Sequence, residues 1–71
     1  MSEVFENFEA MKKHIRLHYG IKGPITVSDN WAYYDEGFGY RKVSLRIYFT
    51  NRMTLGQREY LDKDTKKWTK I

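Results

Sequence analysis

The chain has no cysteine and only one proline in 71 residues. Without cysteine it can form neither a disulfide framework nor a thiolate site, and this absence fits an intracellular protein. No run of residues approaches the ~20 apolar residues that a membrane-spanning helix needs. No signal-peptide pattern is visible either. We therefore expect a single cytoplasmic domain over residues 1–71, with no membrane partner, whose stability comes from packing alone.

Motifs of catalysis are also missing. The sequence contains no G-x-G-x-x-G, no P-loop, no H-E-x-x-H and no nucleophile at a readable distance from a base. The acids that cluster near the predicted sheet are Asp29, Asp35 and Glu36. Asp35 and Glu36 precede two glycines in a turn, which predicts solvated carboxylates instead of a perturbed acid–base pair. We predict that the protein is not an enzyme and has no catalytic residue.

Metal ligands are few. His14 and His18 are four residues apart, so they would share one face of a helix and could fill two ligand positions. A zinc site needs at least a third protein ligand, and the nearest acids in the sequence are Glu6 and Glu9. The pattern favours a surface pair of histidines, and we predict no metal and no other cofactor.

Residues 2–19 have the periodicity of an amphipathic helix. Apolar side chains recur every three or four residues, and Phe5 lies beside the stripe. Ser2 is a candidate N-cap, because its hydroxyl could accept a hydrogen bond from a first-turn amide. Gly20 is placed for a left-handed C-cap. The residues of the stripe are Val4, Phe8, Met11, Ile15 and Tyr19.

Residues 41–50 alternate between apolar and polar side chains. This period of two predicts a half-buried central strand. Further strands are expected over about 25–34, 54–61 and 67–71, with Gly56 weakening the third strand and shifting its phase. One helix followed by a run of strands favours an α+β domain, in which the helix packs on one face of a three- or four-stranded antiparallel sheet.

The two faces of this sheet have different expected roles. The helix stripe should cover one face, made by Ile25, Val27, Val43, Leu45, Ile47 and Phe49, with Trp31 and Trp68. The other face has no second helix and should be open to water or to a partner. We predict that the open face and the glycine-rich loop supply the partner-binding residues Tyr34, Phe38, Lys42, Arg46, Tyr48, Arg58 and Tyr60.

Charge suggests the kind of partner. The formal net charge is +4, and the bases lie after an acidic start that includes Glu3, Glu6 and Glu9. Basic residues interleaved with tyrosines are typical of surfaces that neutralise phosphates and stack on bases. They also occur on the wet face of many ordinary sheets. The leading hypothesis is a regulator or inhibitor that occupies a surface of a nucleic acid or of a nucleic-acid-handling protein.

Two alternatives use the same surfaces. Tyr and Arg on an open face also have the composition of a protein–protein hot spot. The chain could therefore be an adaptor, or an inhibitor of the compact kind that phages encode against host proteins, acting through the open face, the Phe38 loop or an edge strand. The third hypothesis is a homodimer whose open faces meet.

Overall fold

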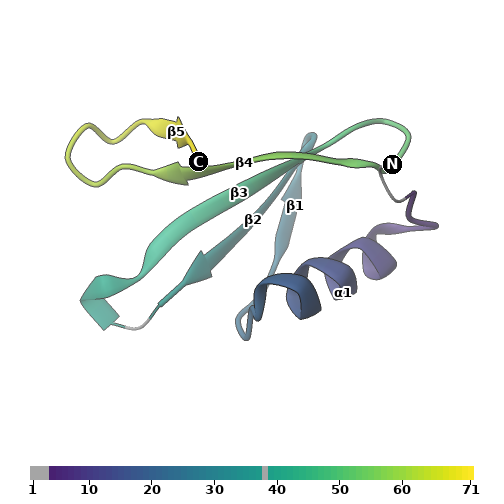
Figure 1. The fold of residues 1–71 in the computed structure, drawn as a ribbon, viewed down its shortest axis with the longest axis horizontal. Coiled ribbons are helices and arrows are strands. Elements are labelled where there is room, and N and C mark those ends of the chain that lie inside the picture. The colour runs from purple at the N-terminus through teal and green to yellow at the C-terminus, as the bar shows by residue number, and fades with distance from the viewer. Residues whose placement is uncertain (1–3, 38) are drawn as a thin grey trace.

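The computed structural model describes residues 4–37 and 39–71, and they form one helix and five strands (Figure 1). The α-helix is α1 (Phe8–Tyr19), and a 3-10 turn, η1, covers Gly39–Arg41. All five strands pair antiparallel in sequence order, as an open meander with β3 at its centre. This confirms the predicted α+β fold, with five strands instead of three or four. The strands are β1 (Thr26–Ser28), β2 (Trp31–Glu36), β3 (Val43–Phe49), β4 (Leu55–Leu61) and β5 (Trp68–Lys70).

Helix α1 begins six residues later than predicted. Its N-cap is Asn7, whose side-chain oxygen accepts a hydrogen bond of 2.8 Å from the Ala10 amide. It ends at Gly20, which adopts the left-handed conformation (φ 67°) and whose backbone amide donates a hydrogen bond to the Arg16 carbonyl. The Gly20 cap is as predicted, whereas the predicted N-cap Ser2 lies outside the described residues.

The residues just before α1 are extended instead of helical. Val4 forms an isolated antiparallel bridge with Thr54, and the Phe5 amide donates to the Met53 carbonyl at 3.1 Å. Consequently Phe5 is buried, while Val4 and Phe8 of the predicted stripe are exposed. Pairing with the β3–β4 connection satisfies backbone groups that the sequence pattern had assigned to a first helical turn.

The predicted strand over 25–34 is two strands joined by a tight turn. Asp29 has a left-handed backbone (φ 54°), and the chain reverses so that Val27 faces Ala32 across the pair. Asp is one of the few side chains that tolerate this conformation. The reversal flips the alternation, because an unbroken strand would have put Trp31 on the same face as Val27. The prediction that Trp31 joins the core is therefore wrong.

The central strand has the predicted phase. Leu45, Ile47 and Phe49 are buried, whereas Arg46 and Tyr48 point to the other face. Strand β4 shifts its register by one residue opposite Tyr48, between the pairs Ile47–Arg58 and Phe49–Leu55. A β-bulge of this kind inserts one extra residue, and it lies at the predicted interruption, Gly56.

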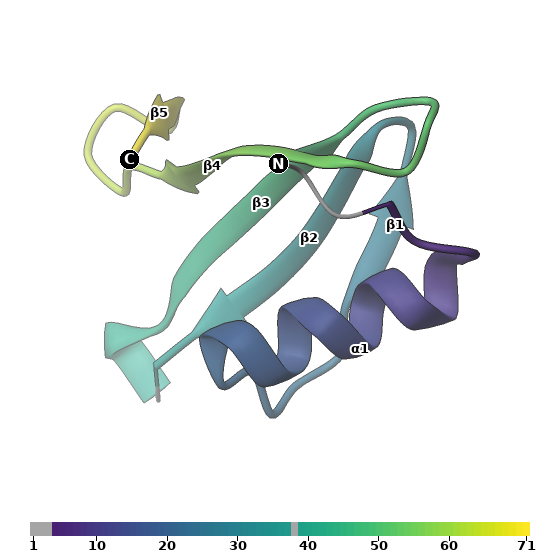
Figure 2. The same cartoon turned by 45° about the vertical axis from the view of Figure 1, so that its right-hand side comes forward.

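The core lies between α1 and one face of the sheet (Figures 1 and 2). In both views the helix runs beside β1 and β2, while the β4–β5 hairpin extends beyond it. Among the described residues, no helix has the length and hydropathy to cross a membrane. The buried hydrophobic residues are Phe5, Met11, Ile15, Ile21, Ile25, Ala32, Tyr34, Leu45, Ile47 and Phe49.

Candidate binding face

The sheet face opposite α1 carries a continuous set of aromatic side chains. Directly paired residues of an antiparallel sheet share a face. Tyr33 pairs with Arg46, which pairs with Glu59, and Trp31 pairs with Tyr48. Trp68 of β5 joins them, because it packs on both Tyr33 and Arg46. The prediction of a core position for Trp68 is therefore wrong. We call Trp31, Tyr33, Arg46, Tyr48 and Trp68 the aromatic face.

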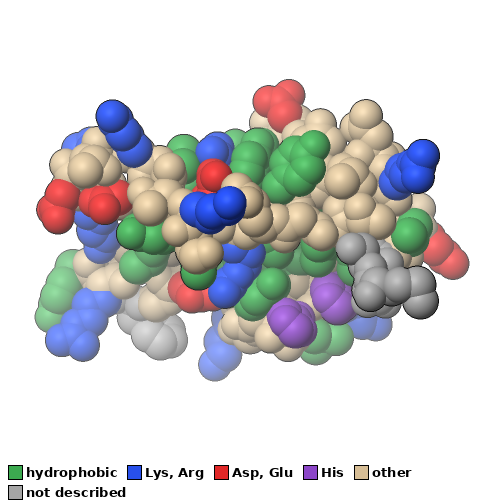
Figure 3. Space-filling model, turned by 45° about the horizontal axis from the view of Figure 1, so that its top comes forward, with side chains coloured by type: hydrophobic (Ala, Val, Ile, Leu, Met, Phe, Trp, Pro, Cys, Tyr) green, Lys and Arg blue, Asp and Glu red, His purple; other side chains and the backbone are tan. Residues whose placement is uncertain are grey.

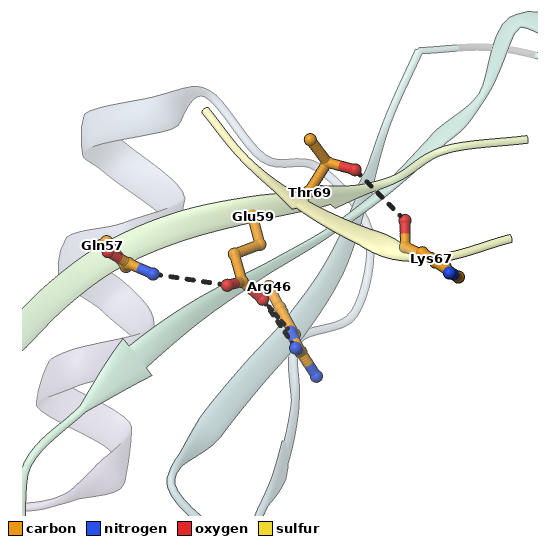
Figure 4. A network of polar contacts seen from close by, with 5 residues as sticks. All are labelled: Arg46, Gln57, Glu59, Lys67 and Thr69. Atoms are coloured by element: carbon orange, nitrogen blue, oxygen red, sulfur yellow. Dashed lines mark hydrogen bonds and ion pairs between the residues drawn. The ribbon is translucent and has the colours of Figure 1, made fainter. Parts of the chain in front are cut away.

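Arg46 of this face is held by polar contacts with β4 (Figure 4). Its Nε and Nη2 atoms donate to one oxygen of Glu59 at 2.8 and 2.6 Å, and Gln57 donates to the other oxygen at 3.3 Å. The two side chains are only 19% and 15% exposed. Charge-assisted hydrogen bonds of this kind are shorter and stronger than neutral ones. The centre of the face is thus a neutralised and firmly held ion pair.

Two tryptophans enclose the Arg46 guanidinium. Its Cζ atom lies 3.9 Å from the Trp31 ring centroid and 4.5 Å from that of Trp68. Guanidinium over an indole face is a favourable cation–π arrangement, stronger when partly desolvated. Because Trp31 comes from β2 and Trp68 from the edge strand β5, these contacts connect two strands that are not neighbours in the sheet through a side chain of the central strand.

The tyrosines extend the cluster at both sides. The Trp31 and Tyr48 centroids lie 5.4 Å apart, and those of Tyr33 and Trp68 lie 5.8 Å apart, both pairs edge to face. Such pairs contribute about 0.5–1.5 kcal/mol beyond area burial. Tyr48 remains 37% exposed. The face is therefore ordered by its own contacts and still presents ring surface to solvent.

Three predicted binding residues lie on the helix side of the sheet instead. Tyr34 pairs with Leu45, which pairs with Tyr60, and Arg58 pairs with Ile47, so all three follow the core side of β3. The prediction that they belong to the open face is wrong, because the β1–β2 turn and the β4 bulge reset the alternation. Arg46 and Tyr48 lie on the open face as predicted, and Lys42 is exposed just before β3. Phe38 lies outside the described residues.

Tyr34 and Arg58 form a separate cluster at the edge of the core. The Arg58 guanidinium lies 4.2 Å from the Tyr19 ring centroid and 3.8 Å from Glu36. The Tyr34 hydroxyl is buried near it, without a well-aligned hydrogen bond among the described residues. Burial raises the pKa of Tyr34, and the positive charge of Arg58 offsets only part of this rise. Burial lowers the pKa of Arg58, but Tyr34, Tyr19 and Glu36 raise it more, so the group stays charged.

Exposed positive charge gathers where the aromatic face ends. Residues 39–71 contain three acids, of which Asp64 is exposed. The other two are partly buried: Glu59 pairs with Arg46, and the Asp62 side chain accepts hydrogen bonds from the amides of Asp64 and Thr65. Figure 3 shows Lys and Arg side chains at both ends of the molecule and also over its middle, among hydrophobic and acidic side chains. The exposed bases in this range are Arg41, Lys42, Arg52, Lys63, Lys66, Lys67 and Lys70.

Five of these bases share one end of the sheet. Lys63 of the β4–β5 turn donates from Nζ to the Tyr40 carbonyl in the β2–β3 turn at 2.8 Å, so the two turns touch. Tyr40 itself is 86% exposed. Both turns lie at the left in Figure 1. We call Tyr40, Arg41, Lys42, Lys63, Lys66 and Lys67 the hairpin-tip cluster.

Other groups offer less chemistry. The rings of His14 and His18 stack at 5.5 Å, and His14 also packs on Phe5 at 5.0 Å. Within residues 4–37 and 39–71, no group of three or more His, Cys, Asp or Glu side chains could hold a metal. An open hollow of about 640 Å³ lies beside the end of α1, and its charged lining balances Lys22 and Lys42 against Asp35 and Glu36.

Sequence reasoning missed Trp31, Tyr33 and Trp68. The signal for the first two was present in the pair Asp29–Asn30, since Asp and Asn are common in two-residue hairpin turns. Trp68 had no comparable signal, because its strand is three residues long.

In comparisons with known proteins, no family model, no curated protein and no solved structure matches this chain.

Proposed function

We propose that this chain is a non-enzymatic binding protein, a regulator or inhibitor that occupies a surface of a nucleic acid or of a nucleic-acid-handling protein. The observation that carries the proposal is the aromatic face, on which Trp31 and Trp68 stack on Arg46 and in turn pack on Tyr48 and Tyr33. No helix of the described residues covers this face of the sheet. Large rings on a rigid sheet are well suited to stack against flat groups of a partner.

The charge distribution supports an acidic partner. The second half of the chain exposes seven bases and the single acid Asp64, because the structure engages Glu59 and Asp62 internally. A surface of one sign raises the rate of encounter with a partner of the opposite sign. Nucleic acids have that sign, and so does an acidic surface of a protein.

A protein target is the second candidate, and the Arg46–Glu59 pair favours it. With its central charge neutralised, the aromatic face resembles an interface hot spot rich in Trp, Tyr and Arg. Such a face would bind a protein through ring burial, with little dependence on salt. A second copy of the chain is one such protein, which would make a homodimer through the open faces.

Affinity capture tests the proposal by comparing the unmodified chain with two variants, one with a negative charge introduced on the aromatic face and one with the same charge introduced on the helix. The tagged chain, Tyr48→Glu and Leu17→Glu would each be incubated with an extract of the source cells, with and without nuclease. Leu17 is the matched control, because it is a large exposed side chain on the helix, at 75% exposure. We expect Tyr48→Glu to lose the captured partner and Leu17→Glu to keep it. The reverse pattern would exclude the aromatic face as the binding surface.

A further inference from the structure

We infer that the specific ligand is a single-stranded nucleic acid, whose phosphates contact the hairpin-tip cluster and whose bases stack on Tyr40 and the aromatic face. This inference rests on the proposed function and names the partner class. The hairpin-tip cluster joins Tyr40 and five exposed bases, on two turns that the Lys63–Tyr40 hydrogen bond holds together.

The positive charges of the cluster are available to a ligand. Arg41, Lys42, Lys66 and Lys67 are exposed. The five bases outnumber the two acids of these turns, Asp62 and Asp64, and Asp62 accepts turn amides at 2.8 and 3.2 Å. Beside Lys42, Asp35 accepts the Ser44 hydroxyl at 3.0 Å. Charge complementarity therefore favours a polyanion at this end of the sheet. Each phosphate neutralised by such a base releases counterions and adds to the salt dependence of binding.

The exposed ring at this end of the sheet is Tyr40, and no packing contact among the described residues requires its exposure. Tyr40 is 86% exposed, although a large ring is more stable when packed. Its contact with Arg41 is loose, at 5.9 Å from Cζ to the ring centroid. An aromatic ring flanked by Lys and Arg side chains is complementary to a nucleobase flanked by phosphates. Base stacking on such a ring is sequence-tolerant, because every base has a π-face.

The geometry favours single strands over duplexes. The rings can stack only on bases whose faces are free, and in a duplex those faces are covered by neighbouring base pairs. The aromatic face also lies on a sheet, and the helix α1, whose first turn carries Glu9, is on the opposite side. Among the described residues, the one α-helix lies away from the open face, so it cannot enter a major groove while that face is bound.

Fluorescence anisotropy with labelled oligonucleotides tests this inference. The probes are a single-stranded oligothymidylate, the same length of oligouridylate, and a DNA duplex, each titrated at low and moderate salt. Lys66→Gln with Lys67→Gln removes two charges from the cluster. The matched control, Lys13→Gln with Lys22→Gln, removes two exposed charges from α1 and the connector after it. Tyr40→Ser is paired with Leu17→Ser as a control for an exposed side chain.

We expect both single strands to bind more tightly than the duplex. The tip double variant should lower the log–log salt slope by about 1.4, since each phosphate contact on a single strand contributes about 0.7, and the control should leave it unchanged. Tyr40→Ser should weaken binding by roughly 5- to 150-fold at constant slope. Equal slopes in the two double variants would overturn the inference. A failure of single strands to bind at low salt would also overturn it. The proposed function would still stand in that case if the unmodified chain captured a protein that the Tyr48→Glu variant did not.

Discussion

Arg46 and Glu59 face each other across β3 and β4, and two nitrogens of the guanidinium share one carboxylate oxygen. Because both side chains are largely enclosed, removing one charge leaves the other desolvated and unpaired. Glu59→Gln should therefore lower the free energy of unfolding by roughly 1–3 kcal/mol. Urea unfolding followed by tryptophan fluorescence measures this change. Glu9→Gln is the control, since the Glu9 side chain is 87% exposed and should change stability little.

The same variant separates the two partner classes. Glu59→Gln leaves Arg46 with an uncompensated positive charge between Trp31 and Trp68. A nucleic-acid ligand should then bind the folded variant more tightly, with a steeper salt slope. Weaker binding of single strands by this variant, under conditions where it is fully folded, would contradict the placement of the nucleic acid on the aromatic face.

Leu45→Asp should unfold the domain. Leu45 is 4% exposed at the centre of the sheet, and a buried unpaired carboxylate costs several kcal/mol, roughly the whole stability of a small domain. Circular dichroism of the purified variant measures the loss of structure. Thr26→Asp is the control, because it inserts the same charge at an exposed position of the edge strand β1. A folded Leu45→Asp protein would mean that the faces of β3 are assigned the wrong way round.

Alkaline pH should destabilise the protein through Tyr34. Burial raises the pKa of Tyr34 above its ordinary value of 10.0, so the folded state holds this proton more tightly than the unfolded state. The stabilisation is fully present below pH 10 and is lost as the pH rises through the higher folded pKa. Chemical unfolding at a series of pH values up to 11.5 measures the fall. Tyr34→Phe should flatten the fall, whereas Tyr40→Phe, at an exposed ring, should leave it unchanged.

Two glycines near the end of α1 should respond differently to alanine. Gly20 has φ 67°, a conformation that costs a residue with a side chain about 1–2 kcal/mol, and Gly20→Ala should lower the melting temperature. Gly23 does not have a positive φ, and an added Cβ would have no atom within 4 Å. Gly23→Ala should therefore be neutral or slightly stabilising, because it restricts the unfolded chain. Thermal melts of both variants compare them, and an equal loss would contradict the left-handed cap.

Local sequence patterns predicted the parts of the fold where the pattern fits a single structure. The alternation over 41–50 predicted β3 and its faces, because a strand with one buried side has a strong period of two. Gly20 predicted the end of the helix, since few residues adopt its backbone conformation. Arg46 and Tyr48 were assigned to the open face by the same alternation, and the structure confirms their positions.

Errors arose where a local pattern had two readings. Val4 and Phe8 continue the helical stripe in the sequence, but pairing of residues 4 and 5 with the β3–β4 connection removes Val4 from the helix and leaves Phe8 as its exposed first residue. Arg58 and Tyr60 alternate with Gln57, Glu59 and Leu61, and neither set is clearly apolar. The pairing with β3 decides which set faces the core, because each residue shares the face of its cross-strand partner.

The sequence by itself determined the fold class, the end of the helix, the central strand and the surplus of positive charge, because each follows from the period or composition of neighbouring residues. Tertiary structure alone decided the composition of the candidate site. Reversal at Asp29 turned Trp31 and Tyr33 to the open face, the short strand β5 brought in Trp68, and the Lys63–Tyr40 contact joined two turns. Each of these depends on which distant residues become neighbours, and in an antiparallel sheet a single turn or bulge changes that for every residue after it.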